Sequence, residues 1–130
     1  MAPALKPSKE DVLSAFRRSA LLESARQVFG ECGFERATME RIAQEAGVAK
    51  GTVYLYYSSK QAIYDEALNE GLAELDQMTR ARLDEASTLR DAVSAFIRAR
   101  SEYFLARREF FRMYVAAISG HVTEQRGRAS

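Results

Sequence analysis

The residues best suited to chemistry form one short run, KGTVY, at positions 50–54. If this run is helical, Val53 and Tyr57 lie four residues apart on one face, which we assign to the core. The opposite face then carries a lysine at its start, followed by small or hydroxyl-bearing side chains: Lys50, Gly51, Thr52 and Tyr54. Such a face suits close approach to the major groove of DNA, which admits an α-helix. The alternative is an ordinary corner between two helices that serves only packing.

Other chemistries lack their residue patterns. The sequence contains no GxGxxG, P-loop, GxSxG or HExxH motif. The single histidine, His121, has no evident partners for a metal site or for general-base catalysis, and we interpret it as a surface residue. The single cysteine, Cys32, has no resolving partner and is expected to pack as a small hydrophobe. We therefore expect no enzyme activity, no cofactor and no metal.

The elements around this run predict a helix-turn-helix at residues 38–57. Thr38 is a suitable cap for a second helix, and Gly47 ends that helix where the turn needs a positive φ. Ala43 is small where the two helices would cross, and Val48 can fill the angle between them. The third helix is expected from about Ala49 to Tyr56. Two helices joined so tightly must cross at a steep angle.

The rest of the chain also predicts helices, so the expected fold class is all-α. Both prolines lie in the first seven residues, and no run alternates in the manner of a strand. Residues 1–14 are polar and are expected to form a flexible arm. An apolar stripe at 21–29 predicts the first helix, ending near Gly33. The tail at 121–130 carries no stripe.

Two capping pairs predict the later helices. Ser58 with Gln61 opens a long helix in which Gly71 marks a bend or a close helix contact. Thr88 with Asp91 opens the next one. The expected buried stripes are Ile63, Ala67, Leu68, Leu72, Leu75 and Met78 on the former helix, and Leu89, Val93, Phe96, Ile97, Tyr103 and Phe104 on the latter. Residues 105–118 are apolar nearly all round, as in a helix enclosed by others.

Composition limits the class of protein. A chain of 130 residues that is 47% hydrophobic fits one globular domain or two small ones. The start lacks the apolar segment of a secretory signal, and no stretch is long and apolar enough to span a membrane, so a cytoplasmic location is expected. The net charge of +1 averages over blocks: nine basic and seven acidic residues at 1–60, then three and seven at 61–90. A near-neutral total therefore does not argue against a nucleic-acid partner.

The sequence resembles the TetR (tetracycline repressor) family of bacterial transcriptional regulators over about residues 15–75. The matching positions fall in order across three helices: Leu22 to Ala25, Phe29, Gly33-Phe34, Thr38, Ile42-Ala43, Ala46 to Val48, Gly51 to Tyr54, Tyr57 and Ser59-Lys60. Where the family often has His then Phe, this chain has Tyr56 then Tyr57. The hydroxyl of Tyr57 must then reach water or a partner near the core.

The resemblance implies roles for eight DNA-binding residues. Thr38 would contact phosphate at the start of the second helix. Lys50, Gly51 and Thr52 would approach base edges from the helix that Ala49 begins. The hydroxyls of Tyr54 and Tyr56 and the ammonium of Lys60 would bind phosphates beside the groove.

The resemblance also implies a function and a domain order. The protein would be a repressor that binds a double-stranded operator as a homodimer and is released by a small effector. Residues 15–75 would form the DNA-binding domain and 76–130 part of an effector and dimerisation domain, because the family typically adds further helices. Six aromatic residues are similar in kind to the lining of an effector pocket or, alternatively, form plain core: Phe96, Tyr103, Phe104, Phe110, Phe111 and Tyr114. The alternative function is a helical protein-interaction module without specific DNA binding.

Overall fold

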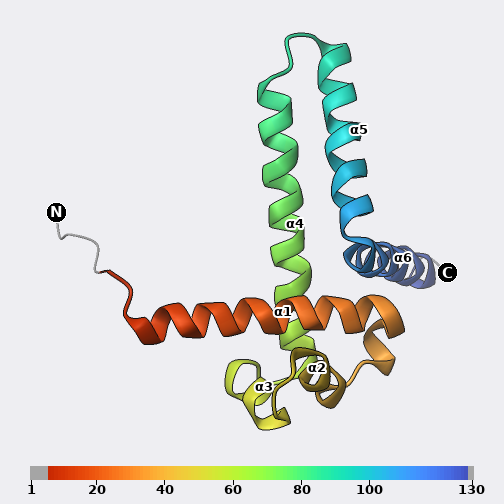
Figure 1. The fold of residues 1–130 in the computed structure, drawn as a ribbon. Coiled ribbons are helices and arrows are strands. Elements are labelled where there is room, and N and C mark those ends of the chain that lie inside the picture. Colours follow the sequence, from red (N-terminus) through yellow and green to blue (C-terminus); the bar gives the residue numbers. More distant parts are fainter. Residues whose placement is uncertain (1–5, 129–130) are drawn as a thin grey trace.

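The computed structural model describes the backbone of residues 6–128 and the side chains of residues 6–120. This part of the chain contains helices and no strand, which confirms the all-α class. The helices are α1 (Lys9–Arg36), α2 (Met39–Ala46), α3 (Lys50–Tyr56), α4 (Lys60–Asp84), α5 (Leu89–Ala106) and α6 (Arg108–Arg128). In Figure 1, α1 crosses the lower part of α4, with α2 and α3 beneath it and the α4–α5 hairpin rising above. Among the described residues, no helix is both long and apolar enough to cross a membrane.

The first three helices and the beginning of α4 share one core. Apolar side chains from all four helices are buried together: Leu21, Leu22, Ala25, Val28, Phe29, Met39, Ile42, Ala43, Val53, Tyr57, Ile63 and Ala67. The stripe expected at 21–29 is part of this core. The core therefore fixes α3 against α1 and leaves the outer face of α3 uncovered.

The first helix is longer than the sequence pattern indicated. It begins at Lys9, because the Ser8 side chain accepts a hydrogen bond from the Asp11 N–H while the Asp11 carboxylate accepts one from the Ser8 N–H. This capping box makes the expectation of a loose arm wrong for residues 9–14. Residues 9–20 are exposed, including the apolar Val12, Leu13 and Phe16, so this segment carries no buried stripe. At the other end Gly33, with φ 78°, interrupts the helix, which resumes as far as Arg36.

The start of α4 also differs from the expectation. Its cap is Ser59 rather than Ser58, since the Ala62 N–H donates to the Ser59 hydroxyl at 3.1 Å. Gln61 instead donates to Asp65 one turn further on. The fully buried positions repeat every fourth residue, so the stripe runs through 63, 67, 71, 75 and 79 rather than through the full expected set.

The helix α5 begins at the expected residue, but fewer of its stripe residues are buried than expected. Thr88 caps it by accepting a hydrogen bond from the Asp91 N–H. Four of the six stripe residues are nevertheless exposed: Leu89, Val93, Phe96 and Ile97. Only the second half of α5 is held, through the buried Ala99 and Tyr103. The apolar stripe of the first half therefore has no partner among the described residues.

Residues 105–118 do not form one enclosed helix. The backbone turns at Arg107 (φ −130°, ψ 68°), and α6 starts at the next residue. Three apolar side chains of α6 are exposed: Phe111, Val115 and Ile118. The tail that carries no stripe is helical as far as Arg128, and the side chain of His121 lies outside the described residues.

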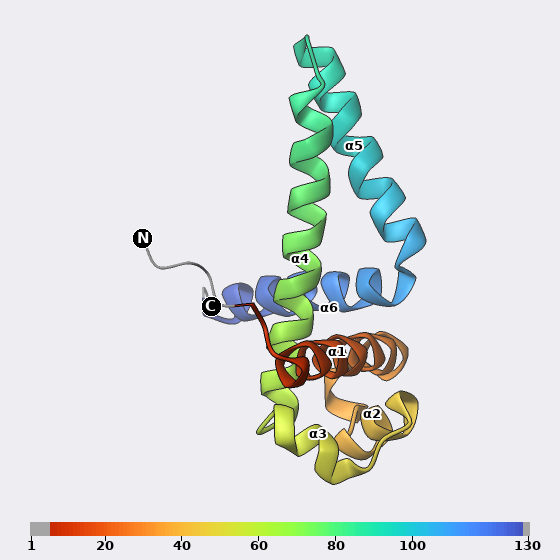
Figure 2. The same cartoon turned by 60° about the vertical axis from the view of Figure 1, so that its left-hand side comes forward.

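Two glycines let the start of α6 approach the other helices closely. A Cβ added to Gly30 of α1 would lie 2.6 Å from the carbonyl oxygen of Glu109. A Cβ added to Gly71 of α4 would lie 2.2 Å from a ring carbon of Phe110. Gly71 thus marks a close helix contact, one of the two alternatives that the sequence suggested. α6 packs against α1 and crosses it steeply, since Figure 1 shows α6 nearly end-on while α1 lies across the view. Figure 2 shows α4 crossing both.

Candidate nucleic-acid interface

The turn between α2 and α3 has the geometry that its residues predict. The Thr38 hydroxyl accepts a hydrogen bond from the Arg41 N–H at 3.1 Å and caps α2. Gly47 adopts the left-handed conformation (φ 70°, ψ 32°), which an L side chain rarely adopts. The Val48 N–H then donates to the Ala43 carbonyl at 3.0 Å, so the turn is closed by backbone hydrogen bonds. The Val48 side chain, which was expected to fill the angle between the helices, is 37% exposed.

The helix α3 presents one face outward. Val53 and Tyr57 are buried, which confirms the side assigned to the core. On the opposite side Gly51 is exposed, Tyr54 is 47% exposed and Leu55 is 82% exposed. Because α3 lies at the end of the molecule away from the α4–α5 turn, this face is open to a large partner (Figure 1).

The eight predicted site residues lie along this end of the molecule, in three groups. Thr38 is exposed at the start of α2, and Lys60 is half-buried at the start of α4. Ala49 caps α3 with its backbone only. The remaining five are on α3, where three are exposed and two are half-buried: Lys50, Gly51, Tyr54, then Thr52 and Tyr56.

Lys50 is held by the preceding helix. Its Nζ lies 2.8 Å from Glu40 Oε1 on α2 and 6.0 Å from the centre of the Tyr54 ring. The hydrogen bond and the charge of Lys50 lower the pKa of Glu40, and the same contact raises the pKa of Lys50. A base edge would therefore share this ammonium with Glu40 or replace Glu40 as its partner, because the ammonium has three N–H groups.

Lys60 has a packing role that sequence reasoning missed. Its Nζ donates to the Phe34 carbonyl at 2.7 Å and to the Glu35 carbonyl at 3.3 Å, and lies 4.3 Å from the Phe34 ring centre. A cation at a helix C-terminus is favourable because the last carbonyls have no partner in the helix. The ammonium has three N–H groups, so one is left for another acceptor. Gly33 interrupts α1 just before these carbonyls.

Tyr57 places its hydroxyl in the core without a protein partner. The atom is buried and makes no hydrogen bond to any described residue, so of the two expected alternatives, water or a protein partner, the described residues do not supply the second. Burial, with the nearby Glu66 carboxylate, raises the pKa of this phenol. The guanidinium of Arg18 lies 5.5 Å from the ring centre. A buried hydroxyl without a hydrogen-bond partner lowers stability.

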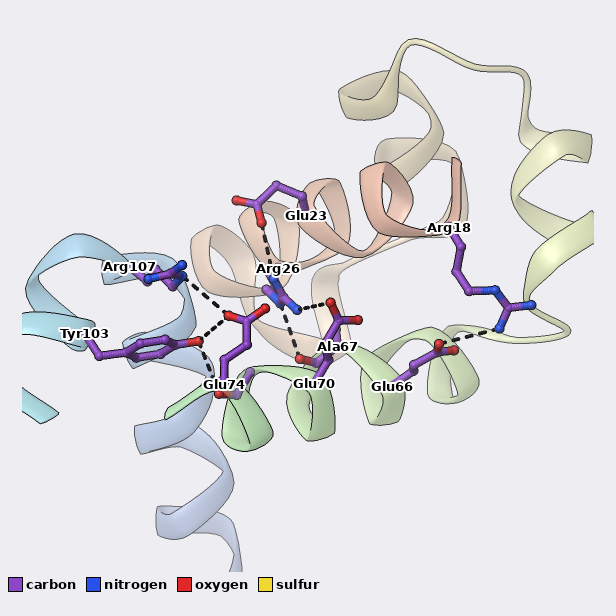
Figure 3. Close-up of polar contacts among 10 residues, drawn as sticks. Arg18, Glu23, Arg26, Glu66, Ala67, Glu70, Glu74, Tyr103 and Arg107 are labelled. Atoms are coloured by element: carbon purple, nitrogen blue, oxygen red, sulfur yellow. Dashed lines mark hydrogen bonds and ion pairs between the residues drawn. The ribbon is translucent and has the colours of Figure 1, made fainter. Parts of the chain in front are cut away.

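A row of carboxylates on α4 connects this region to α1 (Figure 3). Glu66 lies 3.5 Å from Arg18, and Glu70 lies 3.5 Å from Arg26. Arg26 is buried, and its Nε donates to the Ala67 carbonyl at 3.3 Å. The orientation of α1 on α4 is therefore held by charge as well as by the core.

The next carboxylate along α4 contacts the junction between α5 and α6. The Tyr103 hydroxyl lies 3.0 Å from Glu74 Oε2 and donates to the Gly71 carbonyl at 3.1 Å. Arg107 Nε lies 3.7 Å from the same carboxylate. Burial and then Glu74 raise the pKa of Tyr103 to about 12. Sequence reasoning missed this row, although its residues recur every fourth position.

The six aromatic residues proposed for a pocket do not form one set. Tyr103 and Phe110 are buried in a second core cluster. Phe104 packs against Phe111 and Tyr114, with ring centres 5.1 Å apart in each pair. Phe96 contacts the Arg100 guanidinium instead. Ring-on-ring packing favours the core interpretation for five of the six.

A hollow that the sequence did not indicate borders α3 and the turn that precedes it. It has a volume of about 470 Å³ and lies between the first half of α1 and the turn that leads into α3. Its lining is Phe16, Arg17, Ala20, Leu21, Ala46, Val48, Ala49 and Thr52. Two predicted DNA-binding residues thus share a surface with α1.

Comparison with known proteins agrees with this geometry. Residues 21–67 match the family model described as bacterial regulatory proteins, tetR family. The HTH-type transcriptional regulator YfiR of Bacillus subtilis, itself uncharacterized, is 33% identical over 76% of this chain and 56% of its own. The chain thus spans little more than half the length of that relative.

Solved structures share the fold. A TetR family transcription regulator from Marinobacter aquaeolei is 22% identical with a TM-score of 0.73, over 78% of this chain and 53% of its own. The superantigen PfiT is 30% identical with a TM-score of 0.66, over 87% of this chain and 64% of its own. Residues 21–67, which include α2, α3 and most of the core that holds them, match the tetR family of bacterial regulatory proteins.

Proposed function

We propose that the protein is a sequence-specific DNA-binding transcriptional regulator, a repressor, that places α3 in the major groove of an operator. The observation that carries this proposal is the uncovered face of α3, where Gly51, Tyr54 and Leu55 point away from a core that holds Val53. The match to the family model supports it independently. The DNA-binding domain would comprise residues 15–75, and 76–130 would belong to a regulatory domain.

Five of the eight predicted residues have a stated role in this proposal: Thr38, Lys50, Thr52, Tyr54 and Lys60. Thr38 and Tyr54 expose hydroxyls that suit phosphates. Thr52 would meet a thymine methyl or donate a hydrogen bond to a base edge. Lys50 would exchange Glu40 for a guanine, and Lys60 would offer its third N–H to a phosphate while it still holds the end of α1.

The repressor would act as a homodimer on two half-sites in the cytoplasm. A pseudo-palindromic operator needs two recognition helices. The exposed apolar row on α5, which includes Leu89 at 82% exposure, supports a protein interface on this side of the molecule. The half-exposed ring of Phe96 supports a small apolar effector that binds near α5.

The alternative function is a helical protein-interaction module. The likeness to the superantigen PfiT favours keeping it, because that protein shares the fold and has a different described function. The two functions differ in their salt dependence. Binding that neutralises several phosphates weakens log-linearly with salt, whereas an apolar protein interface does not.

The test is selection of duplexes from a random library by the full chain, followed by anisotropy titrations at several salt concentrations. We expect an enriched sequence and a steep negative slope of log affinity against log salt. Thr52→Ala should change the enriched sequence at one base step, whereas Tyr54→Phe should weaken binding to all sequences about equally. Tyr114→Phe on α6 is the matched control for the loss of a phenol hydroxyl. If the wild-type chain enriches no sequence, the proposal is wrong.

A further inference from the structure

The first half of α1 lies directly beside the start of the recognition helix. Both views show α3 beneath this half of α1 (Figures 1 and 2). Arg17 borders the 470 Å³ hollow together with Ala49 and Thr52. A cation from a different helix therefore shares a surface with the residues proposed to approach the bases.

The cationic side chains of the DNA-binding region differ in whether they already have a hydrogen-bond or ion-pair partner within the protein. Five have partners within the protein: Arg18, Arg26, Arg41, Lys50 and Lys60. Arg17 is exposed and has no hydrogen bond or ion pair with any residue that the structure describes. Lys6, Lys9 and Arg36 are also without such partners but do not line the hollow. Arg17 is thus the free cation that borders α3.

We propose that Arg17 binds a backbone phosphate of the DNA beside the groove that α3 enters. The inference rests on the proposed function and adds a contact from α1. A helix in the major groove is flanked by the phosphates of both strands, and most protein–DNA hydrogen bonds go to phosphate and sugar. Arg17 lies on a flanking helix rather than on α3, so its guanidinium reaches the wall of the groove and not a base edge. The planar guanidinium can donate two N–H groups to one phosphate.

Arg17 is better suited to bind a phosphate than the two lysines, because it has no partner among the described residues. Lys50 and Lys60 must share or give up an existing acceptor when DNA binds, because Glu40 and the Phe34 carbonyl already hold them. Arg17 gives up only water. Its side chain is exposed on a helix that is already capped at Ser8, so the contact needs no rearrangement of the backbone.

The experiment compares Arg17→Gln with the wild-type full chain on two duplexes of equal length: the sequence enriched by the wild type and a random sequence. Anisotropy is measured between about 50 and about 200 mM salt. Arg17→Gln should weaken binding to both duplexes by about five- to tenfold at the lowest salt. The slope against log salt should shrink by about 0.9 for each bound protomer. Arg17→Lys keeps the charge and should recover most of the slope.

The control is Arg90→Gln, which removes the same charge from an exposed position at the other end of the molecule. It should leave affinity and slope unchanged, and thermal melts of all variants should coincide. If the wild type binds its enriched sequence but Arg17→Gln behaves like Arg90→Gln, the role of Arg17 is wrong and the proposed function stands. If Arg17→Gln changes which sequence is enriched, Arg17 reads a base and the phosphate assignment is wrong. A wild type that enriches no sequence overturns the proposed function itself.

Discussion

The contact between Gly71 and Phe110 allows a sharp test of how α6 is seated on α4. A Cβ at position 71 would lie 2.2, 2.6 and 2.7 Å from three carbons of the Phe110 ring. Ordinary contact between carbon atoms begins at about 3.5 Å. The ring is only 1% exposed and packs edge-on against Tyr103, so it has no free space into which to move. Gly71→Ala should therefore force a shift of α6.

The expected magnitude follows from two opposing effects. Replacing a glycine within a helix by alanine stabilises the helix by about 1 kcal/mol. Overpacking a core by one methyl group typically costs about 1 to 3 kcal/mol, and a 2.2 Å approach belongs at the upper end of that range. The net expectation for Gly71→Ala is a free energy of unfolding lower by about 1 to 2 kcal/mol, measured by urea titration with circular dichroism.

Two further variants separate overpacking from other causes. Gly120→Ala, in α6, meets nothing within 4 Å, so it should leave stability unchanged or raise it by up to about 1 kcal/mol. Phe110→Leu in the Gly71→Ala background should recover part of the loss, because a smaller side chain accepts the new methyl group. If Gly71→Ala is as stable as the wild type, the close contact between α4 and α6 is not as described.

Three further changes test single contacts. Tyr57→Phe removes a buried hydroxyl that has no hydrogen-bond partner among the described residues, so the free energy of unfolding should rise by about 1 kcal/mol; a clear loss in urea titrations would mean that the hydroxyl is satisfied. Lys60→Met removes the two hydrogen bonds to the end of α1 and should lower the free energy of unfolding by about 1 kcal/mol; an unchanged midpoint would contradict that role. The pKa of Tyr103 is raised to about 12, so its contribution to stability is complete below the ordinary value of 10.0 and is lost as the pH rises towards 12. The stability of Tyr103→Phe should therefore fall less than that of the wild type over this range, and parallel curves in urea titrations against pH would refute the assignment.

The helix-turn-helix could be predicted because its signals are local. Thr38 caps the helix that directly follows it, and Gly47 is the residue type that a left-handed turn requires. The period of the apolar residues then places Val53 in the core and Gly51 outside it. Each of these inferences needs only neighbours within a few positions.

The predictions from sequence were wrong where contacts between distant parts of the chain determine the structure. Ser58 and Ser59 are equally good caps by type, and in the structure Ser59 is the residue that caps α4. The stripe on α5 is apolar, but no described helix covers its first half, so periodicity alone misassigned Leu89 to the core. The pairing of Lys60 with the end of α1 joins positions 26 apart, which no local pattern reveals.

The central claim is that α3 reads DNA, and the most direct measurement is the salt dependence of binding to an enriched duplex by the wild type and by Thr52→Ala. The account predicts that affinity falls log-linearly with salt for both proteins, with the same slope, while Thr52→Ala enriches a sequence that differs at one base step. If the two proteins enrich the same sequence, or if binding is independent of salt, α3 does not read the operator.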